Sequence, residues 1–294
     1  MTLSSRAGVR FIVIVDRGYP ETIPLSVTAS TVGTDIDKTV FINTRGVEPA
    51  MLVDKLIQQL SLFPMSEDRT DGGVALLGWS GGTIWTLSCI ANMDQVSLKS
   101  QSLMAAYVRA HIIKEPPCGC LGLPLPPELW SPLTDATIPD NQRILFYLPW
   151  ITAYFDHGDL QSRDLDAISY SYYAPSVHHA PTIYNISAKE IDELFFNKPL
   201  DYEHALILAT LAKANAVYRK ACDDQVFLEM LPKMIMSVLV GDATCSFSLN
   251  ALFSIQNDNE EENGRIHFNI VPGLNHFIQW DEPKKTFDAY VNAL

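Results

Sequence analysis

The segment from Gly78 to Gly82, Gly-Trp-Ser-Gly-Gly, is the feature that most constrains how this chain can fold. It follows a short apolar run, Val74 to Leu77, that is typical of a buried strand, and it precedes a helix-compatible run from Thr83 to Ala91. A serine at the centre of such a pentapeptide lies on a sharp strand-to-helix turn that exposes its hydroxyl above the sheet. The following helix N-terminus offers N–H groups and a positive dipole end to developing negative charge. The pattern predicts an α/β fold with Ser80 as a candidate nucleophile.

A candidate base for this nucleophile is His276, which lies near the end of the chain. It follows a strand-like stretch, Arg265 to Val271, and precedes a final amphipathic segment. Open α/β sheets place their chemistry on loops at the C-terminal ends of strands. His276 also stands last in the order serine, acid, histidine that this architecture uses. We interpret other histidines of the chain as structural or solvated: His178, His179, His204 and His267.

Two carboxylates are candidates for the acid that orients the imidazole and stabilises the imidazolium. Asp242 ends an apolar run that is typical of a buried strand stopping at glycine. Glu115 follows the strand expected over Met104 to Ile113. We favour Asp242, although a simple turn role stays open for it because Gly-Asp is common turn chemistry. The next positions along that turn hold Ala243 and Thr244, neither of which can carry a negative charge.

These segments together resemble the α/β-hydrolases, and within them a group of fungal proteins with an α/β-hydrolase fold-1 domain. The resemblance covers nearly the whole chain, and the pentapeptide and the His276 segment are its most specific parts. The supporting matches are Glu115-Pro116-Pro117, Tyr154-Phe155-Asp156-His157, Ser162-Arg163-Asp164-Leu165, Gly241-Asp242 and Trp280-Asp281.

The resemblance implies an α/β-hydrolase fold, in which helices flank a mostly parallel sheet. Residues 1–117 and 233–294 would form the core, and residues 118–232 would form a mainly helical lid inserted between two strands. It also implies a serine hydrolase mechanism, with Ser80 as nucleophile, His276 as base and an acid at Asp242 or Glu115. The backbone N–H of Gly81 would then be one donor of the oxyanion hole.

The same resemblance predicts an incomplete N-terminus. Phe11 to Val15 is similar to a family strand, and the Asp-Arg-Gly-Tyr turn after it normally follows an oxyanion loop and a first helix. We therefore expect the chain to lack the His-Gly-rich loop that supplies the second oxyanion donor, unless another segment replaces it. Loss of one such donor lowers turnover on the order of a hundred- to a thousandfold. The expected consequences are a gapped or irregular sheet edge beside the strand that precedes Ser80, and weak hydrolysis of simple esters.

The expected substrate is an ester, thioester or lactone of a small, hydrophobic molecule, cleaved through an acyl-enzyme intermediate on Ser80. Aromatic residues of the lid could line an apolar pocket or could form the lid's own core. The candidate substrate-binding residues are Trp79, Trp150 and Tyr154. The alternative function is a catalytically weak protein that keeps the pocket and binds a small molecule.

Composition and charge limit the size of the domain, the kinds of partner and the cellular location that we expect. A chain of 294 residues with 47% hydrophobic content can bury the core of one elaborated domain. A formal net charge of −13 disfavours nucleic acid or an anionic membrane as a partner. No apolar run near the N-terminus is long enough for a signal peptide or a membrane span, and the five cysteines show no zinc-like spacing. We expect a cytoplasmic protein with reduced thiols, no metal and no cofactor, and the oligomeric state stays open.

Overall fold

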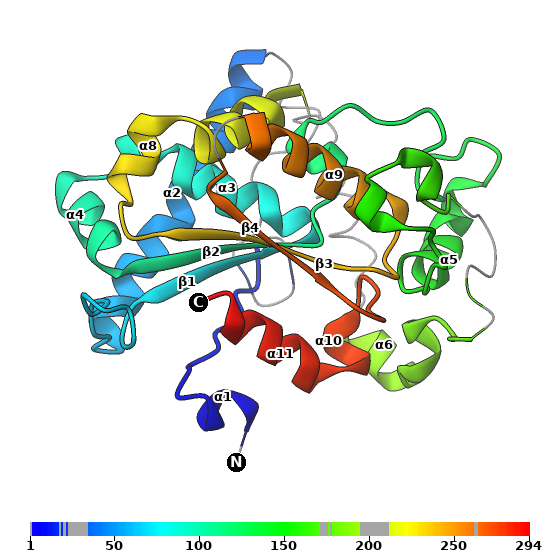
Figure 1. The fold of residues 1–294 in the computed structure, drawn as a ribbon, viewed down its shortest axis with the longest axis horizontal. Helices are drawn as coiled ribbons and strands as arrows, with labels where there is room; N and C mark the ends of the chain where they lie inside the picture. The colour runs from blue at the N-terminus through cyan, green and yellow to red at the C-terminus, as the bar shows by residue number, and fades with distance from the viewer. Residues whose placement is uncertain are drawn as a thin grey trace.

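The computed structural model describes residues 2–17, 19, 22, 35–170, 176, 178–194, 212–261 and 264–294. Its centre is a sheet of four parallel strands in the order β1-β2-β3-β4, with helices on both faces (Figure 1). The predicted α/β class is therefore confirmed. The strands are β1 (Val74–Trp79), β2 (Val108–Lys114), β3 (Ile235–Gly241) and β4 (Ile266–Val271).

Apolar side chains alternate between the two faces of the sheet, as expected for strands that are buried on both sides. On β2, Ile113 packs into the larger core, whereas its neighbour Ile112 packs on the opposite face against the last two helices. The larger core holds side chains of α2 (Asp35–Gln59), α3 (Thr83–Ala91), α4 (Leu98–Tyr107) and α9 (Ser246–Glu261), and the smaller one those of α10 (Ile278–Asp281) and α11 (Pro283–Asn292). In the described part of the chain, no helix combines the length and apolarity needed to cross a membrane.

The strand predicted over Met104 to Ile113 begins later than expected. Residues up to Tyr107 belong to α4, and β2 starts only at Val108. The Met-Ala-Ala-Tyr stretch at the end of α4 contains good helix formers, whereas Val108 is a β-branched residue that fits a pleated sheet. The pattern located the strand's C-terminal end well, and this is the end that carries Glu115.

The strand predicted over Phe11 to Val15 is absent. This segment joins no strand of the described sheet, and its five side chains are 41% to 74% exposed. Phe11 contacts the rings of Phe287 and Tyr290 on α11, and Asp16 forms an ion pair with Arg45 on α2. Because α11 and α2 cover opposite faces of the sheet, the segment connects the two helical layers instead of extending the sheet. Gly18, in the turn that follows, lies outside the described residues.

β1 is the edge strand of the described sheet and pairs with β2. The register between them shifts at Val74/Ala75 and is then regular up to the pair Trp79 and Lys114. Ser80 and Glu115 each follow one member of that pair, so they leave the sheet side by side at its C-terminal edge. Strand pairing therefore brings the candidate nucleophile and one candidate acid to the same end of the molecule.

The predicted lid, residues 118–232, has two parts in the described structure. Its helices α5 (Asp140–Ile151) and α6 (Ala188–Leu194) lie beyond the C-terminal ends of the strands (Figure 1). By contrast, the helical residues 212–222 and α8 (Gln225–Met230) contribute Tyr218 and Phe227 to the larger core. Only the first part is placed to cover the strand ends.

Candidate functional site

Ser80 lies on a tight turn between β1 and α3. A single 3₁₀ turn, Ser80–Gly82, connects the strand to the helix, and Gly81 is its middle residue. The φ angle of Ser80 is +52°, a left-handed conformation that costs a non-glycine residue on the order of 1–3 kcal/mol. Such strain persists where the surrounding structure imposes it, and it concentrates at functional sites. The sharp turn expected from the pentapeptide is therefore present, and the Ser80 side chain is partly exposed on it.

The two flanking glycines of the pentapeptide are not equivalent. A Cβ atom at Gly78 would lie 2.3 Å from Thr86 Oγ1 and 2.7 Å from Thr83 Cα, so any side chain there would push α3 away from β1. A Cβ atom at Gly82 would meet nothing within 4 Å. The close approach of the helix to the strand thus requires glycine only at the first position.

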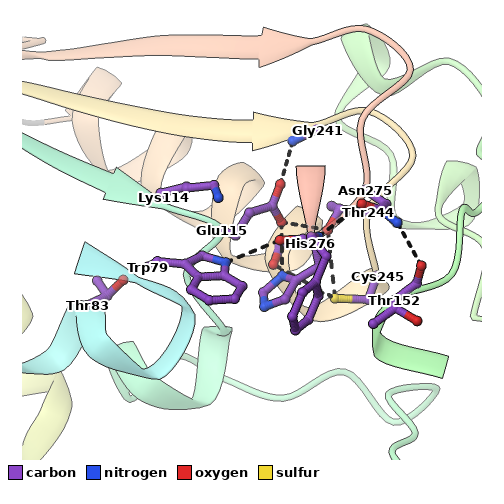
Figure 2. Close-up of polar contacts among 12 residues, drawn as sticks. Trp79, Thr83, Lys114, Glu115, Thr152, Gly241, Thr244, Cys245, Asn275 and His276 are labelled. Atoms are coloured by element: carbon purple, nitrogen blue, oxygen red, sulfur yellow. Dashed lines mark hydrogen bonds and ion pairs between the residues drawn. The ribbon is translucent and has the colours of Figure 1, made fainter. Parts of the chain in front are cut away.

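Glu115 and His276 form a buried pair at the C-terminal edge of the sheet. Glu115 Oε2 lies 3.3 Å from His276 Nδ1, and each residue is only 1% exposed (Figure 2). Glu115 directly follows β2, and His276 lies in the loop after β4. The strand-end loops therefore bring an imidazole and a carboxylate together, although the two residues are 161 positions apart in the sequence.

Backbone and side-chain donors fix the carboxylate of Glu115. Its Oε1 accepts a hydrogen bond of 2.6 Å from the backbone N–H of Gly241, and its Oε2 accepts one of 2.5 Å from Thr244 Oγ1. The φ angle of Glu115 is +50°, so Ser80 and Glu115 are two of five described non-glycine residues with positive φ. Strained residues cluster at functional sites, so two of them at one sheet edge make this edge the candidate site.

Asp242 has a different role in the structure. Its Oδ1 accepts a hydrogen bond of 2.6 Å from the backbone N–H of Gly273, which closes the turn between the ends of β3 and β4. Among the described residues, no hydrogen bond links Asp242 to His276. The geometry therefore favours Glu115 over Asp242 as the partner of the imidazole, which reverses the order that the sequence suggested.

Sequence reasoning missed the contribution of Thr244 and Gly241. Thr244 stands at a position where an acid was sought, and its hydroxyl donates a hydrogen bond to Glu115, the other candidate acid. A Cβ atom at Gly241 would lie 1.9 Å from the backbone oxygen of Leu274, so glycine lets the end of β3 approach the His276 loop. In the sequence, the only signs of these contacts are a threonine and a glycine. Both residue types are too common to predict a hydrogen bond to Glu115 before the fold is known.

Trp79 joins the Ser80 turn to the His276 loop. Its indole N–H donates a hydrogen bond of 3.2 Å to the backbone oxygen of His276, and the two rings lie 5.7 Å apart. Within the described part of the chain, no direct hydrogen bond connects Ser80 to His276. Trp79 therefore packs against the candidate base, beside the candidate nucleophile.

The two other candidate substrate-binding residues are packed inside the protein. Trp150 is 6% exposed and lies in an aromatic cluster with Trp130, Tyr147, Phe155 and Phe247. Tyr154 is 8% exposed, and its hydroxyl donates to Asp281 Oδ2 at 2.6 Å. The cluster around Trp150 is shared between residues 130–155 and the segment that contains Cys245 and Phe247. Phe247 connects that cluster to the site, because its ring lies 5.8 Å from that of His276.

Lys114 is a buried cation directly before Glu115. It is 1% exposed, and its Nζ lies 4.9 Å from the centre of the Trp79 ring and bonds to Gln279. Burial lowers the pKa of Lys114 from its ordinary value of 10.5 to about 7, and the negative charge of Glu115 opposes part of that change.

We expect Lys114→Met to increase stability, and to do so most at low pH. A lysine with a lowered pKa in the folded state destabilises that state fully below about pH 7, and the cost shrinks as the pH rises toward the unfolded value of 10.5. The gain in the free energy of unfolding should therefore be larger at pH 6 than at pH 9. Urea denaturation at both values measures it. An equal loss of stability at the two pH values would show that the contacts of Lys114 with Trp79 and Gln279 stabilise the fold by more than burial of its charge destabilises it.

No group of three or more His, Cys, Asp or Glu side chains in the described ranges could hold a metal ion. All five cysteines are buried, and the structure joins no two of them in a disulfide. A hollow of about 720 Å³ runs along α2 and is lined by residues that include Arg17, Val47, Glu48 and Lys55. None of the candidate site residues lines this hollow.

Neither a protein-family model nor a curated protein matches the sequence. The solved structures similar to the chain include α/β-hydrolases. The chain is 13% identical to the peroxisomal α/β-hydrolase Lpx1 of Saccharomyces cerevisiae over 84% of its own length, spans 58% of the Lpx1 chain, and gives a TM-score of 0.38. For Est816, described as an N-acyl homoserine lactone degrading enzyme, the identity is 15%, the coverage 85% of this chain and 74% of that one, and the TM-score 0.44. For E-2-(acetamidomethylene)succinate hydrolase, the identity is 16%, the coverage 83% of this chain and 71% of that one, and the TM-score 0.35.

Proposed function

We propose that this chain is a serine hydrolase of the α/β-hydrolase type, with Ser80 as nucleophile, His276 as base and Glu115 as acid. The observation that carries the proposal is the buried contact between Glu115 and His276, at the same sheet edge as the strained Ser80 turn. Nucleophile, base and acid on strand-end loops are the arrangement that such hydrolases use. Asp242 is left with the turn contact to Gly273.

In the proposed mechanism, the Glu115 carboxylate accepts a hydrogen bond from His276 Nδ1–H, which fixes the tautomer that leaves Nε2 free to act as the base. His276 Nε2 takes the proton of Ser80 Oγ while Oγ attacks the carbonyl carbon of the substrate. The resulting oxyanion accepts a hydrogen bond from the N–H of Gly81, beside the N-terminus of α3. Collapse of this intermediate breaks the acyl bond, and the leaving group departs with the proton from His276. Water then attacks the acyl-enzyme by the same route and frees Ser80.

The proposed substrate is an ester, thioester or lactone with a small, hydrophobic acyl group. Aromatic rings surround the candidate base: Trp79, Phe247 and Phe277 all have ring centres within 6 Å of the His276 ring centre. Sites for small molecules are mostly apolar with a few placed polar groups. An apolar acyl group would therefore lie against these rings while its carbonyl faces Ser80.

A non-catalytic binding protein is the second candidate function. Two observations favour it: His276 is almost fully buried, and Ser80 has no hydrogen bond to it in the described structure. Gly81 is also the single oxyanion donor that we assign. With one donor missing, turnover would fall on the order of a hundred- to a thousandfold, so a weak enzyme and a binding protein would differ only in whether Ser80 can be acylated.

Labelling by a fluorophosphonate probe, which phosphonylates an activated serine hydroxyl and releases fluoride, separates the two functions. We expect the folded protein to be labelled once, on the peptide that contains Ser80, as measured by mass spectrometry of a digest. His276→Gln should slow this labelling strongly, and the heat-denatured protein should not react. A folded protein that stays unlabelled, or that is labelled elsewhere, would favour the binding protein.

A further inference from the structure

Asn275 connects the His276 loop to a region that we call the cap segment, residues 150–185 in their described parts. Asn275 is fully buried, and its Nδ2 donates hydrogen bonds of 2.7 Å to the backbone oxygen of Thr152 and to Thr182 Oγ1. Its Oδ1 accepts from the backbone N–H of Phe277 at 3.0 Å. Both donors of this amide are therefore used on the cap segment, and its acceptor fixes the backbone on the far side of His276.

Asp281 forms the second connection, five positions after His276. Its Oδ2 accepts from the hydroxyls of Tyr154 and Thr182, and its Oδ1 accepts from Asn185 Nδ2 at 2.9 Å. The hydroxyl of Thr182 thus accepts from Asn275 and donates to Asp281. One buried hydroxyl links the residues on both sides of the candidate base.

This network is separate from the proposed chemistry. None of its members is bonded to Glu115 or Ser80 in the described structure, yet Thr152, Thr182 and Asn275 are all fully buried. Buried polar groups lose much of their stabilisation when one partner is removed, and a complete network favours one arrangement of its parts. Apolar packing alone has no such directionality. The network therefore specifies where the His276 loop lies relative to the cap segment.

We propose that Thr182, Asn275 and Asp281 are positioning residues, through which the cap segment holds the His276 loop in register with Glu115. That the network supports turnover rests on the proposed function. That the network positions His276 does not depend on that function. A displacement of about 1 Å at a catalytic group can lower turnover on the order of a hundredfold. Docking of the cap segment would then be a condition for catalysis and not only a cover over the substrate.

Three single variants test this proposal. Thr182→Val removes the bridging hydroxyl at nearly constant volume, and Thr182→Ser keeps it. Thr286→Val is the matched control, because Thr286 is also fully buried but its hydroxyl has no hydrogen-bond partner among the described residues. The readouts are kcat and KM for an ester substrate, and the ring ¹⁵N shifts of His276 by NMR, assigned with His276→Gln.

For Thr182→Val we expect kcat to fall on the order of ten- to a hundredfold with KM changed less than about twofold, and the His276 ring signals to shift. Thr182→Ser should restore both, and Thr286→Val should change neither. If Thr182→Val does not fold, Tyr154→Phe removes one donor to Asp281 and should shift the same signals by less. His276 signals that are unchanged in Thr182→Val, or equally changed in Thr286→Val, would overturn the proposal. A wild type that the fluorophosphonate does not label refutes the proposed function alone, because the NMR readout does not depend on activity.

Discussion

Replacing Ser80 by alanine is expected to remove most of the ester hydrolysis, a loss that can reach the order of a millionfold where a serine nucleophile is removed from a complete triad. The physical reason is that no acyl-enzyme can form without Oγ, while the oxyanion donor and the binding surface stay in place. The measurement is steady-state hydrolysis of a p-nitrophenyl ester, with circular dichroism to verify the fold. Residual turnover equal to that of the wild type would assign the chemistry to another group.

Ser80→Gly is the matched variant, because it removes the same hydroxyl and also relieves the backbone. Alanine keeps the positive φ of +52° that glycine adopts without a Cβ penalty. Both variants should be inactive, but Ser80→Gly should be more stable than Ser80→Ala by about 1 kcal/mol in urea denaturation. Equal stability of the two would show that the turn imposes no strain on this residue.

The Ser80 turn could be predicted from the sequence because all of its determinants are local. An apolar run, a glycine, the serine and a helix-forming run follow one another within Val74 to Ala91, and strand, turn and helix form there as expected. The need for glycine at Gly78 is likewise local, since the clashing atoms belong to α3. His276 was identified in the same way, as a histidine in the loop that follows a strand.

Non-local contacts decided the features that the sequence did not predict. Phe11 to Val15 has the β-branched, apolar composition of a strand, but strand formation depends on a partner. Instead, Phe11 packs against α11, and Asp16, directly after the segment, pairs with Arg45 on α2. The network through Thr182 joins residues 93 and 99 positions apart, and no spacing rule connects them. Packing of the cap segment against the His276 loop creates those contacts.

Which carboxylate contacts His276 could also not be predicted from the sequence, because two carboxylates follow neighbouring strands of the sheet. Glu115 leaves β2 beside the Ser80 turn, since Trp79 pairs with Lys114, and Gly241 and Thr244 at the end of β3 donate to its carboxylate. Asp242 follows β3, and its carboxylate turns toward Gly273. Strand register and two hydrogen bonds from the end of β3 and the residues after it hold the Glu115 carboxylate beside His276, and neither is visible in a run of residues.

Glu115→Gln is therefore expected to lower kcat by roughly ten-thousandfold, the scale seen when a triad acid is replaced by its amide. The amide keeps the size of the side chain but removes the negative charge that stabilises the imidazolium, and its N–H₂ group can hold His276 in the wrong tautomer. Asp242→Asn is the matched control, because it makes the same chemical change one strand away. Its Oδ1 can still accept from the N–H of Gly273, so kcat should change by less than about tenfold.

The comparison depends on both variants being folded, which thermal unfolding can establish before any kinetics. Glu115 is buried with donors on both oxygens, so its amide should cost some stability, on the order of 1–3 kcal/mol for one mismatched buried group. A folded Glu115→Gln protein with nearly normal kcat, beside an Asp242→Asn protein that has lost turnover, would return the acid to Asp242. It would also mean that the 3.3 Å contact between Glu115 and His276 breaks when substrate binds. Loss of turnover in Glu115→Gln alone would instead make the pair at the ends of β2 and β4 the acid and base of the reaction.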